Sequence, residues 1–203
     1  MALIIGLVGK PKRGKGTCTK IITGILKEYD VGIRARTLTF SADLLAPELV
    51  RRALPLSREN MQRLAQEWVT TEGAGALSRR MKILIESESL AGVHVIFVDG
   101  VRWFSDRDLI RSFPLNFLLY VYCSPEAAYK RSKEQNDKAG DQTMSFEEFM
   151  RLDGALNERS ISEIGRGADF VIDNEVGDRE GELLRAKIEH NVIPKVLARL
   201  GIS

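Results

Sequence analysis

A short stretch near the amino terminus, GKPKRGKGT at residues 9–17, combines glycine and lysine at a spacing that suits phosphate binding. Gly9 and Gly14 leave room for backbone N–H groups to converge on phosphate oxygens. A helix that follows the loop would add its positive amino-terminal end, and Lys15 would place a point charge at the outer phosphates. We interpret this stretch as a phosphate loop, against the alternative of a glycine-rich turn with basic residues by chance.

The residues around the lysine define the kind of phosphate site. Many such loops place a hydroxyl directly after the lysine as a ligand of Mg²⁺, whereas this sequence has Gly16 there and a hydroxyl one position later, at Thr17. We count Thr17 as a candidate contact both of the inner phosphates and of the metal. Lys12 and Arg13, inside the loop, are either further phosphate contacts or solvated charges.

A phosphate loop needs a strand before it and a helix after it, and the whole chain follows that alternation. Apolar runs of strand length occupy residues 3–8, 35–40, 93–98, 117–122 and 168–172. Segments of helical periodicity occupy residues 17–29, 43–54, 57–90 with a break at 73–75, 105–112, 125–136, 146–164 and 179–200. The alternation predicts an α/β fold, in which helices cover both faces of a five-stranded parallel sheet.

Three of the expected helices also carry start signals. Ser124 precedes Pro125, a residue that suits the first helical position. Ser145 and Ser105 each stand three residues before an acidic residue, which is the spacing of a capping box. We therefore expect helices to begin directly after these three serines.

Composition narrows the class of protein. The chain has 203 residues, enough for a single domain, and its formal net charge of +2 is too small to indicate a nucleic-acid partner. Its two cysteines, Cys18 and Cys123, do not indicate a disulfide framework, and its two histidines stand too far apart for metal-ligand spacing. No apolar run approaches the roughly 20 residues of a membrane helix, and the amino terminus lacks signal-peptide features. We expect a cytoplasmic protein without a membrane partner.

These motifs resemble the phosphate-loop (P-loop) nucleoside and nucleotide kinases, in particular the group that contains dephospho-coenzyme A kinase and deoxynucleoside monophosphate kinase. Gly-Lys-Gly-Thr, residues 14–17, is similar to the adenylate-kinase type of loop, in which the metal is reached largely through water. FSADLLAPELV, residues 40–50, resembles the segment that opens the acceptor-binding helix of dephospho-coenzyme A kinases. The general base proposed for that family falls on Asp43, whereas the family's preceding Asp is Ser41 here.

The resemblance implies further site residues. VDGVRWFSDRD, residues 98–108, resembles the monophosphate kinase branch and lacks the Pro-Leu-Leu signature of dephospho-coenzyme A kinases. Within it, Asp99 would contact Mg²⁺ through water, or it is only half of an Asp-Gly turn. Arg102 would bind the acceptor phosphate, or it forms a surface salt bridge. ADFVIDNEVGDREGELLRAKI, residues 168–188, is similar to the last strand, turn and helix of both branches, which puts Asn174 beside the adenine of ATP.

Two further segments would complete such a kinase. Residues 42–90 would form the acceptor-binding part, with Arg63 as a candidate contact. The polar stretch 130–145 is either a disordered loop or a lid that closes over the site. As a lid it would bring Arg131 to the phosphates, with Lys138 where the family often has a second arginine.

The sequence thus predicts one P-loop kinase domain over residues 1–203. It would use ATP and Mg²⁺ and transfer a phosphoryl group to a small-molecule acceptor, with Lys15, Asp43, Arg102 and Arg131 as the catalytic residues. A nucleoside monophosphate is the first candidate acceptor and dephospho-coenzyme A the second. A rival of another class is a regulator that binds ATP and hydrolyses it slowly or not at all.

Overall fold

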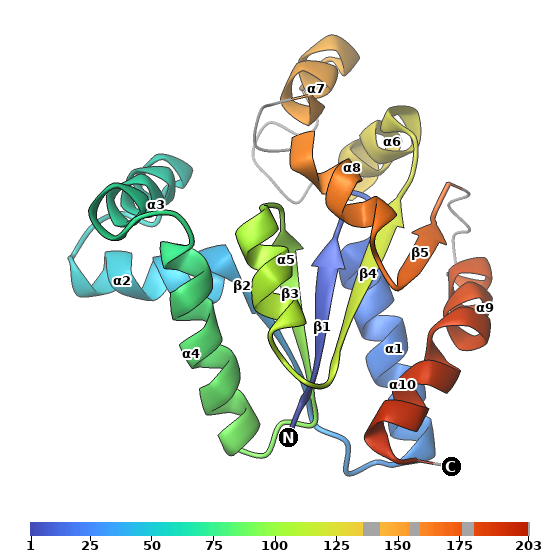
Figure 1. Cartoon of the computed structure of the whole chain (residues 1–203). Coiled ribbons are helices and arrows are strands. Elements are labelled where there is room, and N and C mark those ends of the chain that lie inside the picture. Colours follow the sequence, from blue (N-terminus) through green and yellow to red (C-terminus); the bar gives the residue numbers. More distant parts are fainter. Residues whose placement is uncertain (136–142, 155–158, 176–180, 203) are drawn as a thin grey trace.

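The computed structural model describes residues 1–135, 143–154, 159–175 and 181–202. They form an α/β structure whose centre is a parallel sheet (Figure 1). The five strands are β1 (Leu3–Val8), β2 (Ala35–Thr39), β3 (Val95–Val101), β4 (Asn116–Tyr122) and β5 (Phe170–Asp173). Their order in the sheet is β2-β3-β1-β4-β5, and every neighbouring pair is parallel. The predicted five-stranded parallel sheet is confirmed.

β1 lies at the centre of the sheet because both of its faces are apolar. All of its residues are buried, with Leu3, Ile5 and Leu7 packed on one face and Ile4 and Val8 on the other. Its register with β3 pairs Leu7 with Asp99. The carboxyl ends of these two strands therefore lie side by side, at the edge of a parallel sheet where ligands bind.

Helices cover both faces of the sheet, as expected. One face carries α1 (Lys15–Tyr29), α9 (Glu182–Asn191) and α10 (Ile193–Leu200), and the other carries α4 (Ala76–Leu90), α5 (Phe104–Arg111) and α8 (Arg159–Arg166). The remaining helical elements lie toward the carboxyl end of the strands in Figure 1: η1 (Phe40–Leu45), α2 (Ala46–Arg51), α3 (Arg58–Glu72), α6 (Pro125–Gln135) and α7 (Phe146–Asp153). Among the residues described, no helix is both long and apolar enough to cross a membrane.

Some helix bounds differ from those expected. The break at residues 73–75 is present, since Gly73 and Gly75 both adopt positive φ, at 84° and 82°. The single helix expected at 43–54 is instead a π-helical turn, η1, followed by α2. The helices expected at 146–164 and 179–200 are each divided in two. Pro194, at the start of α10, explains the second division because its nitrogen has no hydrogen to continue the helix.

The helix starts test the capping predictions. Ser124 and Ser145 cap α6 and α7, where their hydroxyls accept the N–H groups of Ala127 and Glu148, both at 3.1 Å. The prediction for Ser105 is wrong, because α5 already begins at Phe104. The Asp106 carboxylate instead folds back and accepts the N–H groups of Arg102 and Trp103, the two residues that precede the helix.

Asp106 is a buried connection between two helices. Its carboxylate accepts the N–H groups of Arg102 and Trp103 at 3.1 and 3.0 Å, and the hydroxyl of Ser78 in α4 at 2.9 Å. Burial raises the pKa of Asp106. A raised pKa in the folded state means that this carboxyl binds a proton more readily folded than unfolded, so its contribution to stability falls as pH rises from about 4.

We expect Asp106→Ala to lower the free energy of unfolding by about 2–4 kcal/mol, because three donors lose their acceptor, among them the buried hydroxyl of Ser78. Urea unfolding at neutral pH measures this difference. Asp108→Ala is the matched control, since Asp108 lies on the same helix with an exposed ion pair to Arg107, and such pairs contribute below about 1 kcal/mol. Equal losses in the two variants would contradict the prediction.

Candidate phosphate-binding site

The stretch 9–14 forms a loop between the end of β1 and the start of α1. Gly9 and Gly14 have φ of 143° and 96°, and Lys12 has φ of 60°. These left-handed conformations turn the chain sharply from strand to helix, and they explain the glycines at two of the three positions. Because α1 begins at Lys15, its positive end faces the loop, as a phosphate site requires. Gly16 and Thr17 are exposed in the first turn of this helix.

Lys15 folds back over the loop. Its ammonium donates to the carbonyls of Gly9 and Lys10 at 2.8 and 3.1 Å and lies 3.7 Å from Oδ1 of Asp99. Asp99 stands at the carboxyl end of β3, next to the end of β1. The structure thus brings together the predicted phosphate lysine and the predicted metal contact.

Asp99 also fits a metal site because one of its carboxylate oxygens accepts no hydrogen bond from the described residues. Its Oδ1 is buried and accepts no hydrogen bond from any residue that the structure describes. A buried oxygen without a donor is unfavourable unless water or a cation meets it. This fits an outer contact to Mg²⁺ through water, although the described residues contain no cluster of three or more side chains that would hold a metal by themselves.

Arg13 and Lys10 point to a residue that the sequence analysis missed. Arg13 is only 4% exposed, and its guanidinium binds Asp153 Oδ1 at 2.9 Å. The ammonium of Lys10 donates to Asp153 Oδ2 at 2.9 Å and to its carbonyl at 2.7 Å. Asp153 is the last residue of α7. Lys10 and Arg13 therefore share one carboxylate, and no motif around Asp153 signals that partnership.

Asn174, predicted beside the adenine, is buried against the loop. Its side-chain amide donates to the carbonyl of Arg13 at 3.0 Å, and its backbone N–H donates to Tyr122 at 2.8 Å. Its nitrogen lies so close to Gly14 that a Cβ there would be 2.2 Å away. In this structure Asn174 holds the phosphate loop in place.

Arg131 of α6 is anchored on the same side of the loop. Its guanidinium donates to the carbonyl of Asn174 at 2.6 Å and to the sulfur of Cys123 at 3.1 Å. The predicted lid, 130–145, lies only partly within the described residues, since 136–142 and with them Lys138 fall outside. At the end of this segment, the hydroxyl of Tyr129 donates to the carbonyl of Met144 at 3.0 Å.

Asp43 and Arg102 lie at the ends of β2 and β3. Oδ2 of Asp43 accepts the N–H of Thr39 at 2.7 Å, while Oδ1 lies 3.5 Å from the guanidinium of Arg36. Asp43 therefore acts at least as a cap of the π-helical turn. Arg102 is half-buried, and its carbonyl accepts the hydroxyl of Ser160 at 2.5 Å.

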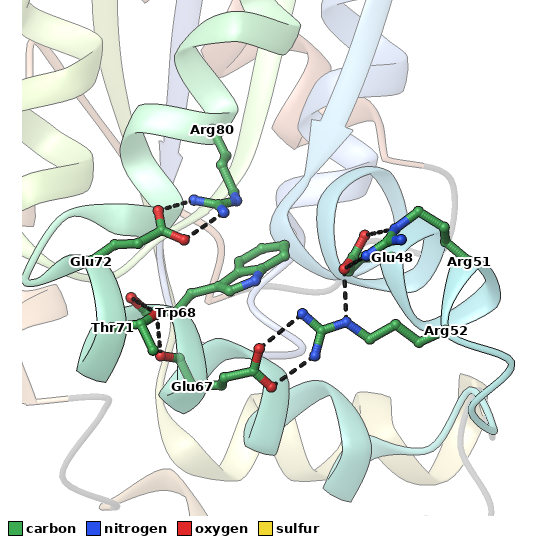
Figure 2. Close-up of polar contacts among 8 residues, drawn as sticks. All are labelled: Glu48, Arg51, Arg52, Glu67, Trp68, Thr71, Glu72 and Arg80. Carbon is green, nitrogen blue, oxygen red and sulfur yellow. Dashed lines mark hydrogen bonds and ion pairs between the residues drawn. The ribbon is translucent and has the colours of Figure 1, made fainter.

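The helical part 42–90 contains a cavity of about 640 Å³ whose charges are paired (Figure 2). Arg52 binds Glu67 through two hydrogen bonds and also Glu48. Arg80 pairs with Glu72 and lies 4.1 Å above the ring of Trp68. The lining residues are Asp43, Leu44, Pro47, Glu48, Arg51, Arg52, Glu67, Trp68, Thr71, Glu72, Arg80 and Leu84.

Hydrogen bonds from Arg51 and Arg52 lower the pKa of Glu48 to about 2. A lowered pKa means that the stabilisation by this carboxylate is present above its unfolded pKa, near 4.3, and is lost as pH falls toward 2. Arg63, the other candidate in this part, lies outside the cavity and pairs with Glu59 on the surface at 3.0 Å.

Neither cysteine offers a reactive thiolate. Both are free and buried, and burial raises the pKa of Cys18 to about 12 and also raises that of Cys123. The thiolate is the nucleophilic form of cysteine, so nucleophilic chemistry at these positions is disfavoured.

Comparison with protein sequences gives remote relatives without an assigned activity. No family model matches the chain. It is 28% identical over 173 residues to a UPF0200/UPF0201 protein of Archaeoglobus fulgidus, which covers 84% of this chain and 50% of that protein. It is 27% identical over 137 residues to a UPF0200 protein of Methanosarcina mazei, covering 66% of this chain and 67% of that protein. The chain thus spans half the length of the first relative and two thirds of the second.

Comparison with solved structures gives similar folds at low identity. Shikimate kinase from Bacteroides thetaiotaomicron has a TM-score of 0.55 and 14% identity, with 98% of each chain covered. Shikimate kinase from Acinetobacter baumannii in complex with shikimate has a TM-score of 0.51 and 14% identity, covering 96% of this chain and 95% of that one. At such identities the likeness establishes the fold alone. The chain has the fold of the P-loop kinases.

Proposed function

We propose that this protein transfers a phosphoryl group from ATP to a small-molecule acceptor. The observation that carries the proposal is the position of Lys15, which begins α1 directly after the loop at the end of β1 and lies 3.7 Å from Asp99 at the end of β3. Phosphoryl transfer asks the protein mainly to position the reactants and to supply positive charge. A loop of backbone N–H groups, a lysine and a carboxylate beside that lysine are groups that supply both.

The residues would act as follows. The loop N–H groups and the start of α1 hold the phosphates of ATP, while Lys15 turns from the carbonyls of Gly9 and Lys10 to the phosphate oxygens. Mg²⁺, when bound, neutralises phosphate charge, and Asp99 with Thr17 would hold it, Asp99 through water. Arg131 and the segment 130–145 would close over the site and keep water away from the reacting phosphate.

For the acceptor, we propose a nucleoside monophosphate, with dephospho-coenzyme A as the second candidate. Dephospho-coenzyme A would accept through a hydroxyl, which needs a general base, whereas a monophosphate is already an anion. Both oxygens of Asp43 face Thr39 and Arg36, which supports the candidate that needs no base. Arg102, at the end of β3, would bind the acceptor phosphate through its planar fork.

A screen of acceptors with γ-labelled ATP and Mg²⁺ tests the proposal. Nucleoside monophosphates, dephospho-coenzyme A and small hydroxylated metabolites are each incubated with the full chain, and labelled products are separated. Label on a monophosphate would support the whole proposal. Label on another acceptor would support kinase activity and would identify a different substrate. ATP binding with no labelled product from any acceptor would favour the regulator.

For a monophosphate acceptor, we expect Asp43→Asn to lower kcat less than about fivefold, because asparagine still accepts the N–H of Thr39 at this position. A general base contributes about 10²–10⁴-fold, so a loss in that range would show that the acceptor is a hydroxyl. Arg36→Met is the control for loss of the ion pair between Arg36 and Asp43. It removes the guanidinium and leaves the carboxylate of Asp43 in place. Steady-state rates at saturating ATP measure both effects.

A further inference from the structure

A second, smaller cavity lies beside the phosphate loop. It has a volume of about 200 Å³, many times what one water needs. The phosphate loop, the end of β4, the start of α6, the end of α7 and α8 contribute its wall, elements that converge above the carboxyl end of β4 in Figure 1. The lining residues are Lys10, Arg13, Tyr120, Val121, Tyr122, Cys123, Pro125, Asp153 and Ser162.

The charged residues of this wall are not balanced. Lys10 and Arg13 both bind Asp153, and Asp153 is the single carboxylate among the described residues that line the cavity. Arg13 and Asp153 are 4% and 8% exposed, so water screens their charges poorly. Two cations that share one carboxylate leave an excess of positive charge in a largely buried place.

The hydrogen-bond capacity of Arg13 is unfilled as well. Its Nη2 donates to Asp153, but its Nη1 is buried and has no hydrogen-bond partner among the residues that the structure describes. A buried donor at a charged group without an acceptor is strongly unfavourable. Ser162 adds a hydroxyl to the same wall. One anion with oxygen acceptors would satisfy the charge and the donor together.

We propose that this cavity binds a small oxyanion, either an inorganic oxyanion or a small carboxylate, at a site separate from the nucleotide. The anion would take its hydrogen bonds from Nη1 of Arg13 and from the ammonium of Lys10, so it would compete with Asp153 for Lys10 and for the positive charge of Arg13. Because Asp153 ends α7 and the two cations belong to the phosphate loop, occupancy would change how α7 is held against that loop. A bound anion would thus change the conformation of the phosphate loop.

The rival explanation is that the excess charge serves only the phosphates of the nucleotide. Saturation with a non-hydrolysable ATP analogue separates the two, because the analogue fills the phosphate loop up to the γ position. The experiment with this analogue rests on the proposed function, because it requires that the protein binds ATP. The existence of the anion site does not depend on that function. If the analogue fails to bind, the proposed function fails, and Lys15→Ala can then be used to remove anion binding at the loop.

The experiment is calorimetric titration of the full chain with inorganic phosphate and, separately, with acetate, in the presence of the analogue. We expect residual binding of at least one of the two, and the stronger of them identifies the source of the oxyanion. Arg13→Met should weaken this binding at least about tenfold, as loss of a hydrogen bond to a charged group does. Asp153→Asn should tighten it about tenfold, because the competing carboxylate is gone.

The opposite signs of these two changes are the decisive readout, since damage to a merely structural ion pair would weaken binding in both variants. Lys10→Met, at a residue whose side chain is 25% exposed, replaces Arg13→Met if that variant does not fold, and it should also weaken binding. Arg107→Met, which removes an exposed cation of α5, should leave the affinity unchanged. Absence of anion binding beyond the nucleotide, or weaker binding in Asp153→Asn, would overturn the proposal.

Discussion

Lys15→Ala is expected to reduce phosphoryl transfer by about 10³-fold or more, which is the scale at which a cation that faces the transferred phosphoryl group acts. The ammonium already lies at the mouth of the loop, held by two loop carbonyls and 3.7 Å from Asp99. Its removal leaves the loop N–H groups in place. Binding of ATP should therefore weaken less than the rate falls, because lysine contributes most when charge moves onto the outer phosphates.

The same variant should be nearly as stable as the natural protein. The contacts of Lys15 named above are two loop carbonyls and the Asp99 carboxylate at 3.7 Å, so we expect the free energy of unfolding to change by less than about 2 kcal/mol. Lys20→Ala, which removes an exposed lysine of the same helix, is the control for charge. Normal turnover in Lys15→Ala with every acceptor that the natural protein accepts would remove the phosphate-loop assignment.

The fold could be predicted from the sequence because its signals are local. The three central strands, β1, β3 and β4, are short apolar runs that are largely buried in the sheet, as Val95–Val98 and Leu118–Leu119 illustrate. Gly73 and Gly75 mark the helix break because positive φ is easy for glycine. Alternation of such runs with helices leaves few topologies open, since parallel strands need crossover helices.

The contacts around the phosphate loop could not be predicted, because they join distant parts of the chain. Arg13 meets Asp153 across 140 positions, and Asn174 reaches the carbonyl of Arg13 across 161. A single charged residue at the end of a helix has no periodicity that identifies its partner. The cap of α5 was assigned to the wrong pair, because Asp106 rather than Asp108 folds back onto the backbone before the helix, and Ser78 of a distant helix holds the same carboxylate.

Asn174 illustrates how a contact seen in the fold extends a role assigned by resemblance. The resemblance places it beside the adenine, and this remains a prediction. Its buried side chain, however, already donates to the phosphate loop, while its carbonyl accepts from Arg131 of α6. One residue thus links the base of the predicted lid to the loop that would hold the phosphates. The loop can be disturbed from this side without a change in any phosphate contact.

Gly14→Ala should cause that disturbance, and we expect it to lower affinity for ATP about 10²-fold. Gly14 has φ of 96°, where a residue with a Cβ is strained by about 1–2 kcal/mol. The new Cβ would lie 2.2 Å from Nδ2 of Asn174, so the amide must move and lose its bond to Arg13. Together the strain and the lost hydrogen bond destabilise the binding conformation of the loop by about 3 kcal/mol, which corresponds to a loss of about 10²-fold in ATP affinity. Calorimetric titration with ATP and urea unfolding measure both quantities.

Two further variants separate the causes of this loss. Gly24→Ala, inside α1 and with no atom from beyond the neighbouring helix backbone within 4 Å of its Cβ position, should stabilise the protein by about 0.5–1 kcal/mol and leave ATP affinity unchanged. Asn174→Ala alone should weaken ATP binding by loss of the loop contact. If the clash with Asn174 is the mechanism, Gly14→Ala combined with Asn174→Ala should be no less stable than Gly14→Ala, because the amide is already displaced in the single variant. Strictly additive losses would instead show that the two residues act independently, and that the strained backbone at residue 14 alone sets the shape of the loop.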